Sequence, residues 1–445
     1  MSNRSCIMII ILLCSTLPAF AGTGLVRFAS PWTSPYRADP NHPFHLVNGE
    51  GKHLFVVNKT AWLYFGCKYP EAVLDRAIEQ GVNVLRVSLE GQYYYETVGI
   101  ELWPWQGTRS KPVWSGFDNA YWDEVERRIR LAGARGIGLD LTLYCSLQPS
   151  ADQIEAQRPY WSCTLQRLGK YANILTWEIA NEYLGNEAFQ QAVGEYFRAN
   201  DPYGRPVCTS DGTTDDAAWP DRTWIDLAIN HTCTSSANDR HDLKDWYLAL
   251  ARNTRSHGKP AWCNESGREN RHGNNDGVHR RKQGWLWSAA GCFWTWHSWD
   301  GCEGIDDVSY KAPGAEFLKP MADYFKALPF WELSPNYTAL TLPDQPDLVW
   351  ATLAQPDRAA VVMYLCTRVT GQAVKGRSAQ VRLPKGNYRI TFQKPSDLSV
   401  LDTLDHSATG LGRVDPIALP DFTDDLIVTI KRPLPATRTR IPGTQ

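Results

Sequence analysis

The amino-acid sequence predicts an α/β protein in which a (β/α)8 barrel is followed by a smaller antiparallel β-sandwich domain. Through most of the chain, short apolar runs rich in β-branched residues alternate with stretches of helical periodicity, as in parallel βα units. After residue 335 the pattern changes to short alternating runs separated by Pro, Gly and Asp, which indicates an antiparallel sandwich. The first pattern repeats eight times, as in a TIM barrel.

The eight expected strands of the barrel cover residues 53–58, 83–89, 137–144, 174–181, 206–210, 226–231, 260–265 and 291–297. The expected helices cover residues 70–80, 119–135, 151–172, 186–199, 239–257, 277–290 and 315–328. In the second of these helices, Trp122, Val125 and Ile129 recur at helical spacing, which predicts one apolar face. The segment 213–224 has no such period, so we expect a loop there.

The predicted domain boundaries follow these patterns. We expect the barrel to span residues 22–335 and the sandwich to span residues 336–433. The expected sandwich strands cover residues 347–353, 359–366, 378–383, 387–392 and 425–431. The tail 434–445 is rich in Pro, Thr and Arg, so it is predicted to be disordered.

The first 21 residues have the pattern of a secretory signal peptide. Arg4 precedes an apolar run from Cys6 to Leu17, and Ala19-Phe20-Ala21 follows with small residues at the two positions that a cleavage site requires. We therefore expect cleavage after Ala21 and a secreted or periplasmic protein. The run is shorter than the roughly 20 residues of a membrane-spanning helix, so we expect no stable membrane insertion, with an N-terminal anchor as the alternative.

Composition excludes several kinds of partner. A net charge of -2 provides no basic excess for neutralising phosphates, so nucleic acid is not an expected partner. The cysteines form no C-x-x-C pair, which makes a zinc site improbable, although Cys292 and Cys302 could form a disulfide. The acidic residues after the eighth strand do not have the spacing of an EF-hand loop, so no metal is expected. The 19 tryptophans suit stacking on sugar rings.

Two glutamates end barrel strands at the expected catalytic rim. The fourth strand runs into Asn181-Glu182, and the seventh ends in Asn264-Glu265. Strands four and seven lie roughly opposite across the mouth of a barrel, so their terminal side chains can face each other. Two carboxyl groups about 5–5.5 Å apart are what hydrolysis of a glycoside with retention requires. The sequence therefore predicts glycosidase chemistry at this edge.

These motifs resemble those of the clan A retaining glycoside hydrolases. The resemblance covers the barrel and implies that Glu182 is the acid/base, Glu265 the nucleophile and Asn181 the partner of the sugar 2-hydroxyl. It also implies that Arg86 on strand two supports the nucleophile and that His231 on strand six lies in the site. The expected activity is hydrolysis of O-glycosidic bonds in a poly- or oligosaccharide, without a cofactor.

Three aromatic residues are further candidates for binding the substrate. Trp296 on strand eight resembles the sugar-stacking platform of the clan. Tyr144 ends strand three, where the clan often has a histidine. Trp105 lies with Trp103 and Trp114 in the long loop after strand two, where it could shape a subsite or form a local apolar core.

Within the clan, the sequence resembles the apiosidase-like group. The resemblance is carried by Tyr121-Trp122-Asp123 at the start of a helix and by Leu328-Pro329-Phe330-Trp331 before the second domain. In that group a barrel is followed by a domain of the type named for collagen binding. That name implies no activity, and we expect the sandwich to be mainly a structural companion of the barrel.

The sequence bears on three other interpretations. A barrel that binds carbohydrate without catalysis would not need both glutamates, whereas a transglycosylase would share every site residue. A metal-dependent barrel of the enolase type requires carboxylates at three successive strand ends, and strand three ends in Tyr144 and Cys145 instead.

Glu178 shares a strand face with Glu182, and we expect it to be a buried partner of a neighbouring cation.

Overall fold

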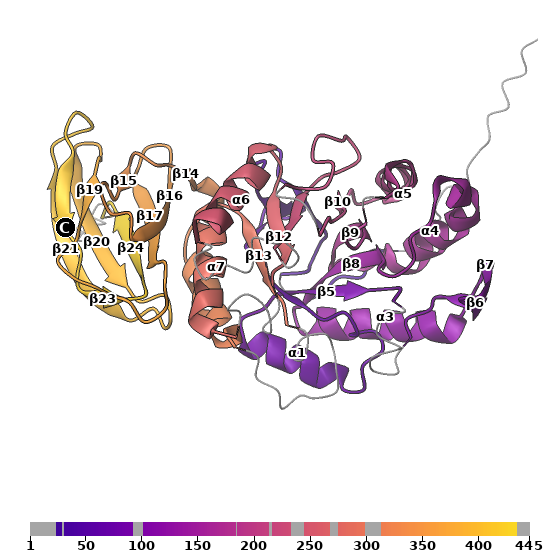
Figure 1. Cartoon of the computed structure of the whole chain (residues 1–445). Helices are drawn as coiled ribbons and strands as arrows, with labels where there is room; N and C mark the ends of the chain where they lie inside the picture. Colours follow the sequence, from indigo (N-terminus) through magenta and orange to yellow (C-terminus); the bar gives the residue numbers. More distant parts are fainter. Residues whose placement is uncertain are drawn as a thin grey trace, which may run out of the picture.

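The computed structural model describes residues 24–28, 31–91, 101–183, 185–212, 216–232, 244–267, 275–298 and 313–433. Figure 1 shows a barrel and an antiparallel β domain side by side, with α6 and α7 between them. Cys302, the possible disulfide partner of Cys292, and residues 239–243, the start of a predicted helix, lie outside the described residues. No helix of the described part is long and apolar enough to cross a membrane.

The barrel is an eight-stranded parallel sheet, as predicted. Its strands are β4 (Val57–Thr60), β5 (Val84–Ser88), β8 (Gly138–Tyr144), β9 (Ile174–Ala180), β10 (Val207–Cys208), β11 (Ala228–His231), β12 (Ala261–Glu265) and β13 (Phe293–Trp296). They pair in the order β10-β9-β8-β5-β4-β13-β12-β11. Between β10 and β11 the Asp226 amide donates to the Val207 carbonyl at 2.8 Å, which bridges the remaining seam.

The barrel helices are α1 (Pro70–Glu79), α3 (Asn119–Ala134), α4 (Ile154–Leu168), α5 (Glu187–Asn200), α6 (Lys244–Ser256), α7 (Gly277–Ala289) and α8 (Leu318–Lys326). The predicted apolar face of α3 is buried. Asp118 caps this helix by accepting from the amides of Ala120 and Tyr121, which satisfies two donors of the first turn. Residues 216–224 contain no helix, which agrees with the predicted loop.

The first predicted strand, 53–58, was wrong as a single element. His53–Leu54 forms β3 of a separate antiparallel sheet with β1 (Tyr36–Ala38) and β2 (Leu46–Asn48). The barrel strand β4 starts only at Val57. An apolar run cannot reveal such a division, because both halves are buried.

The C-terminal domain contains antiparallel sheets, in agreement with the predicted fold class. A six-stranded sheet is formed by β14 (Ser334–Pro335), β16 (Leu348–Ala354), β17 (Ala360–Thr367), β24 (Asp425–Lys431), β20 (Gly386–Gln393) and β21 (Val400–Ala408). A second sheet contains β15 (Leu340–Thr341), β19 (Ser378–Val381) and β22 (Asp415–Ala418), and β18 (Ala373–Val374) pairs with β23 (Phe422–Thr423). Strand β21 was not predicted because it is an edge strand, mostly exposed on both faces, and lacks alternation.

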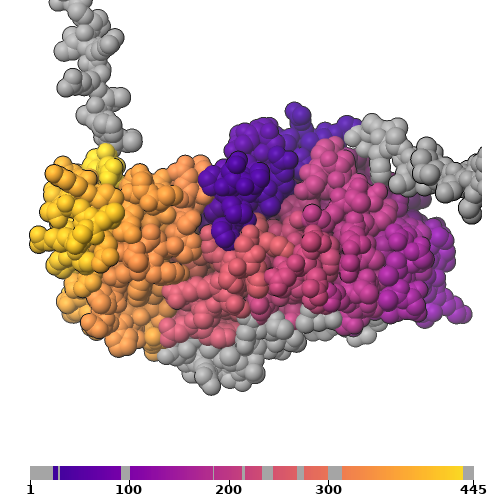
Figure 2. Space-filling model, turned by 90° about the horizontal axis from the view of Figure 1, so that it is seen from above, coloured from indigo at the N-terminus to yellow at the C-terminus, as the bar shows by residue number. Residues whose placement is uncertain are grey.

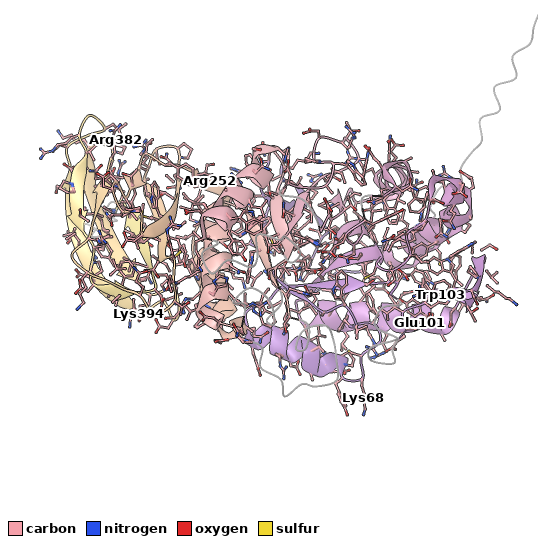
Figure 3. All side chains as sticks on the ribbon, in the orientation of Figure 1. Lys68, Glu101, Trp103, Arg252, Arg382 and Lys394 are labelled. Carbon is pink, nitrogen blue, oxygen red and sulfur yellow. The ribbon has the colours of Figure 1, made fainter. Side chains whose placement is uncertain are left out.

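Helix α7 lies between the two domains and contacts β13 on one side and β16 and β17 on the other. All but the first two of its residues are buried, including several charged ones. Trp285 stacks on Tyr364 of β17 with ring centroids 5.6 Å apart. Arg252 of α6 lies 4.2 Å over the ring of Tyr337, close to the domain junction (Figure 3). These contacts join the domains through one continuous apolar core.

A buried ion pair at this junction gives a prediction about stability. Arg281 donates two hydrogen bonds to Asp425, at 2.9 and 2.8 Å, and both side chains are buried. Replacing Arg281 with Met would leave Asp425 buried without its cation, so we expect the free energy of unfolding to fall by about 3–5 kcal/mol. Urea unfolding measures this loss.

The matched control is Arg389→Met, which removes the exposed pair between Arg389 and Asp405. Exposed pairs contribute little, so the unfolding curve of this variant should match that of the wild type. If Arg281→Met unfolded at the wild-type urea concentration, α7 would not hold the two domains together in the way described here.

Candidate active site

The candidate active site lies at the C-terminal ends of the barrel strands. Asn181 and Glu182 follow β9, His231 ends β11 and Glu265 ends β12. Arg86 is the third of the five residues of β5 and pairs with Asp140 of β8. Because the strands are parallel, these ends meet at one edge of the barrel. The structure thus brings together five of the eight residues predicted for the site.

Arg86 is the centre of this group. It is fully buried, and its Nη1 donates to Glu265 Oε2 at 2.7 Å. Its Nε and Nη2 form a two-point contact with Glu178 at 2.8 and 2.6 Å. Nη2 also donates to Asn181 Oδ1 at 2.9 Å, and the guanidinium lies 4.3 Å over the ring of Trp62. A buried arginine with these partners fixes the orientation of both carboxylates.

Two further carboxyl groups lie below the catalytic rim. Burial opposes ionisation of Glu178, but the charge and hydrogen bonds of Arg86 lower its pKa. Burial, and then the charge of Glu178, raise the pKa of the neighbouring Asp140 to about 7. Glu178 is thus the buried partner of a cation, and the cation is Arg86. Asp140 was not predicted, although a charged residue inside an apolar strand is the same signal that pointed to Arg86.

Glu265 presents its two carboxylate oxygens to different surroundings. Oε2 accepts a hydrogen bond from the charged Arg86 side chain, which fixes the position of this oxygen. Oε1 lies 3.8 Å from Nε2 of His297, which follows β13. Among the described residues, no group donates a hydrogen bond to Oε1. The side chain is 5% exposed. One oxygen is therefore held in place while the other is available to react.

Glu182 is held above the rim by a different set of contacts. Its backbone has φ 51°, in the left-handed region that non-glycine residues adopt rarely. Its Oε1 lies 2.9 Å from His231 Nδ1, and its side chain is 29% exposed. The backbone amide of Glu182 donates to Ser210 Oγ at 3.2 Å. Glu182 is thus open to solvent, whereas Glu265 is enclosed.

The hydrogen bonds of His231 fix where its protons lie. Asn264 directs Nδ2 toward the carboxylates of Glu178 and Asp140, at 3.2 and 3.4 Å, so its Oδ1 must face His231. His231 Nε2 therefore carries a proton and donates a hydrogen bond to Asn264 Oδ1 at 2.8 Å. The contact between Nδ1 and Glu182 then holds one further proton, on either the imidazole or the carboxyl. The pair can store the proton that an acid catalyst needs.

The two rim carboxylates face each other at close range. One carboxylate oxygen of Glu182, one of Glu265 and a ring nitrogen of His231 all lie within 4.8 Å of one another. Three such groups could in principle meet at a cation. The Arg86 guanidinium, 2.7 Å from Glu265, already supplies positive charge there and opposes the entry of another cation.

The comparisons with known proteins identify the family. A sequence profile of the apiosidase-like catalytic domain matches residues 41–293, which is more than half of the chain. The chain belongs to the apiosidase-like family. Its barrel is the catalytic domain of a glycoside hydrolase, so the predicted enzyme class, with a carbohydrate as the substrate, is confirmed. No curated protein matches the chain in sequence.

Solved structures support the same fold for this apiosidase-like chain. One, described as a glycoside hydrolase, has a TM-score of 0.69 at 16% identity, and the match covers 90% of this chain and 98% of the other. A glycoside hydrolase family 5 protein from Bacteroides vulgatus ATCC 8482 has a TM-score of 0.65 at 17% identity, covering 89% and 93%. At this level of identity the likeness shows the fold alone.

The structure does not bring the three predicted aromatic residues to an open surface of the apiosidase-like barrel. Trp296 is 1% exposed, with Arg280 4.4 Å and Lys59 5.3 Å from its ring centroid, so it is no stacking platform in this structure. The hydroxyl of Tyr144 donates to Gln157 and accepts from Trp161 inside the core. Their strand-end positions were read correctly, but sequence does not reveal which neighbours cover a ring.

Trp105 is likewise buried. Its ring packs against Trp103, Trp114 and Tyr160, with centroids 4.8, 5.1 and 4.6 Å away. The cluster is therefore the local apolar core that the sequence left as an alternative. Trp103 and Trp114 are its half-buried members. Trp103 lies on the side of the barrel away from the β domain, near the hairpin of β6 (Trp105–Thr108) and β7 (Lys111–Phe117) (Figure 3).

A glycine that the sequence did not single out supports Glu182 in the apiosidase-like site. A Cβ atom on Gly212 would lie 2.5 Å from Oε1 and 2.6 Å from Cδ of Glu182. We expect Gly212→Ala to displace this carboxyl from His231 and lower kcat about 100-fold, because a shift of about 1 Å can have that effect. Steady-state kinetics with an unactivated glycoside measures it.

Gly412→Ala is the control, since a Cβ there would meet nothing within 4 Å. It should leave kcat unchanged. Circular dichroism should show both variants folded. Wild-type kcat in a folded Gly212→Ala variant would mean that Glu182 does not act from the position described here.

Proposed function

We propose that this enzyme hydrolyses O-glycosidic bonds with retention, using Glu265 as the nucleophile and Glu182 as the acid/base. The observation that carries the proposal is the pair of rim carboxylates, whose closest oxygens lie within 4.8 Å of each other. That spacing suits direct attack, whereas inversion needs carboxyl groups about 6.5–9.5 Å apart to admit a water. Their unequal surroundings suit unequal roles.

In the first step, Glu265 Oε1 attacks the anomeric carbon and the bond from that carbon to the leaving oxygen breaks. Glu182 gives its proton to the leaving oxygen, and a covalent glycosyl-enzyme forms. In the second step, a water attacks the same carbon, its proton passes to Glu182, and the bond to Glu265 breaks. Arg86, which donates to Glu265 Oε2, orients the nucleophile in the first step and stabilises the carboxylate that leaves in the second step.

Asn181 is suited to bind the substrate. Its Oδ1 is fixed by Arg86 at 2.9 Å, which orients the amide group next to the acid/base. In the proposed site, its Nδ2 donates to the sugar hydroxyl beside the reacting carbon. Such bonds strengthen in the transition state and lower the barrier.

The family indicates which substrates to test first. Since the family is named for apiosidases, glycosides of apiose are the first substrates to test, followed by plant, algal and microbial polysaccharides. The test is release of reducing sugar by the wild type, with the Glu182→Ala/Glu265→Ala double variant as the control. Sugar release by the wild type alone supports the proposal. Equal release by both proteins, or binding without release, would contradict it. The second outcome would favour a carbohydrate-binding barrel.

The pH dependence should report the proton shared by Glu182 and His231. Burial disfavours the imidazolium, but the hydrogen bond with Glu182 and the charge of Glu265 raise the pKa of His231. We expect kcat/KM to fall as pH rises through this raised pKa, above the usual value of about 6.5. In His231→Gln this alkaline limb should move to lower pH, because an amide stabilises the ionised carboxylate without holding a proton.

The control for this experiment is His257→Gln, since His257 pairs with Asp216 away from the site. Its pH profile should match that of the wild type. An alkaline limb at the same pH in wild type and His231→Gln would show that His231 does not share the catalytic proton.

We also propose that the protein is secreted or periplasmic. Support comes from the pattern of residues 1–21 alone. Mass spectrometry of the protein from its native host should find a mature chain that starts at Gly22. A chain that retains Met1 would contradict the proposal.

A further inference from the structure

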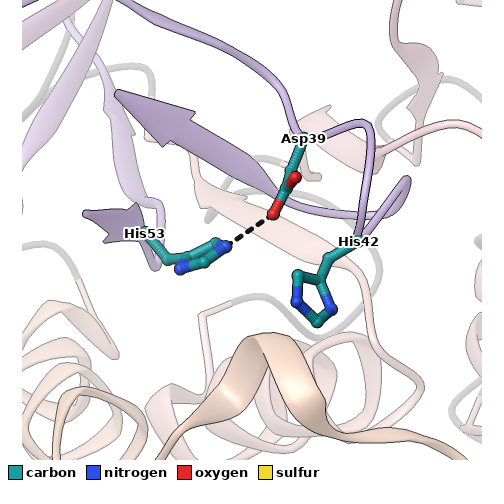
Figure 4. Close-up of side chains that lie close together, drawn as sticks. All are labelled: Asp39, His42 and His53. Atoms are coloured by element: carbon teal, nitrogen blue, oxygen red, sulfur yellow. Dashed lines mark hydrogen bonds and ion pairs between the residues drawn. The ribbon is translucent and has the colours of Figure 1, made fainter. Parts of the chain in front are cut away.

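Three polar side chains lie together near the start of the chain, away from the proposed catalytic site. Asp39 follows β1, His42 lies in the loop between β1 and β2, and His53 opens β3 (Figure 4). His53 borders a hollow lined by Leu54, Asn83 and Ile137, which all precede barrel strands. The cluster therefore lies at the N-terminal end of the barrel, opposite the rim that carries Glu182 and Glu265.

The three side chains converge on a small volume. His53 Nε2 and Asp39 Oδ2 are 2.7 Å apart, and the rings of His42 and His53 meet edge to face with centroids 5.5 Å apart. One nitrogen from each histidine and one oxygen from Asp39 all lie within 4.8 Å of one another. Two imidazoles and a carboxylate are a ligand set that zinc and similar divalent transition metals prefer.

The surrounding contacts hold two of these groups in fixed orientations. The Asn41 amide donates to Asp39 Oδ1 at 2.8 Å, which turns the other oxygen toward the histidines. The ring of His53 stacks on Trp331, with centroids 4.5 Å apart and planes 6° apart. Such supporting contacts are what fix metal ligands in proteins. Figure 2 shows the N-terminal residues (indigo) lying beside the C-terminal segment (orange).

His42 is the residue that a simple hydrogen-bonded pair does not explain. Asp39 and His53 satisfy each other, yet His42 also points its ring at them. Among the described residues, its ring nitrogens have no hydrogen-bonding partner. Its loop is held by backbone bonds, from the His45 amide to the His42 carbonyl at 2.8 Å and from the Asp39 amide to the His45 carbonyl at 2.9 Å. His42 is half-buried, which leaves a path from solvent.

We propose that Asp39, His42 and His53 bind one divalent transition metal ion of the zinc type, with water completing the coordination. Tetrahedral ligands lie roughly 3.4 Å apart at zinc distances, so rotation of the half-buried His42 side chain closes the site. The metal joins the N-terminal hairpin to the segment that contains Trp331. This role is structural, because the site lies at the end of the barrel opposite the catalytic rim.

The test is calorimetric titration of the full-length mature protein with ZnCl2 after dialysis against EDTA. We expect one ion per chain for the wild type. Replacing one ligand should weaken binding by at least about 100-fold, since even changes to supporting residues weaken metal binding 10- to 100-fold. His42→Ala and Asp39→Asn are the two variants. His42 is half-buried, so its removal should not prevent folding, and circular dichroism checks this.

Two controls separate this site from others. His257→Ala removes a histidine that has two carboxylate neighbours, Asp216 at 2.7 Å and Asp221 at 3.7 Å, but belongs to neither group of possible metal ligands found among the described residues. Glu265→Gln alters the other cluster able to hold a cation, at the rim. Both should bind zinc like the wild type. The proposal is overturned if the wild type binds no zinc, if His42→Ala binds it equally well, or if Glu265→Gln loses the binding.

Discussion

Glu265→Ala is expected to lower the turnover of natural substrates by about 10⁴–10⁶, the loss typical of removing a covalent nucleophile. Arg86 donates to Glu265 Oε2, and Oε1 accepts from no donor among the described residues. Attack on the anomeric carbon therefore depends on Oε1. Alanine leaves a cavity at that position. Kinetics with an aryl glycoside, with and without azide, measure the loss and its rescue.

Azide should fill the cavity and attack the anomeric carbon in place of Glu265, which gives a glycosyl azide of inverted configuration. The matched control is Glu195→Ala, which removes an exposed glutamate of α5 and should change nothing. Wild-type turnover by a folded Glu265→Ala variant would remove Glu265 from the mechanism. A glycosyl azide of retained configuration would instead show that Glu265 is the acid/base.

Glu182→Ala should have a second large effect, and one that depends on the leaving group. Natural glycosides need a proton on the departing oxygen, so we expect their turnover to fall by about 10²–10⁴. Glycosides of acidic phenols leave without a proton, so their first step should remain fast. Azide should then speed release of the glycosyl-enzyme and give a product of retained configuration.

A comparison of two aryl glycosides with phenols of different pKa separates these effects. The ratio of their kcat/KM values should be much larger in Glu182→Ala than in the wild type. A ratio like that of the wild type would show that Glu182 does not protonate the leaving group. In His231→Gln this ratio should stay nearer the wild-type value, because the Glu182 carboxyl is still present in that variant.

Much of the fold could be predicted because barrel strands are marked locally. Seven of the eight predicted strands overlap barrel strands as whole elements, since each is an apolar run between turns. The first was divided, because residues 53–54 pair with the N-terminal hairpin, a contact that apolar character cannot specify. Edge strand β21 escaped prediction for a related reason. It buries too little surface to show a period of two.

The site was predictable where position in a strand determines the neighbours. Glu182, Glu265 and Arg86 point to one region because parallel strands end at the same edge. Trp296 and Tyr144 have the same kind of position, yet their rings are covered by residues from other segments, such as Arg280 and Trp161. Coverage by distant side chains has no local signal.

Other contributions depend on contacts that the chain makes only when folded. Gly212 matters because the carboxyl of Glu182 occupies the space that a Cβ atom would need, and nothing in the sequence around Gly212 indicates this. His42 and His53 are separated in sequence by β2 and the turn that follows it, and the pairing of β2 with β3 brings them together. Asp140 could have been found, because a carboxylate in an apolar strand calls for a partner.

The central claim is that Glu182 and Glu265 act as a retaining pair. Proton NMR tests it most directly, by following the anomeric signal of the sugar released by the wild-type enzyme before mutarotation. The account predicts that the first product has the same anomeric configuration as the substrate. A first product of inverted configuration would contradict it, because the carboxylates would then have to act through an intervening water.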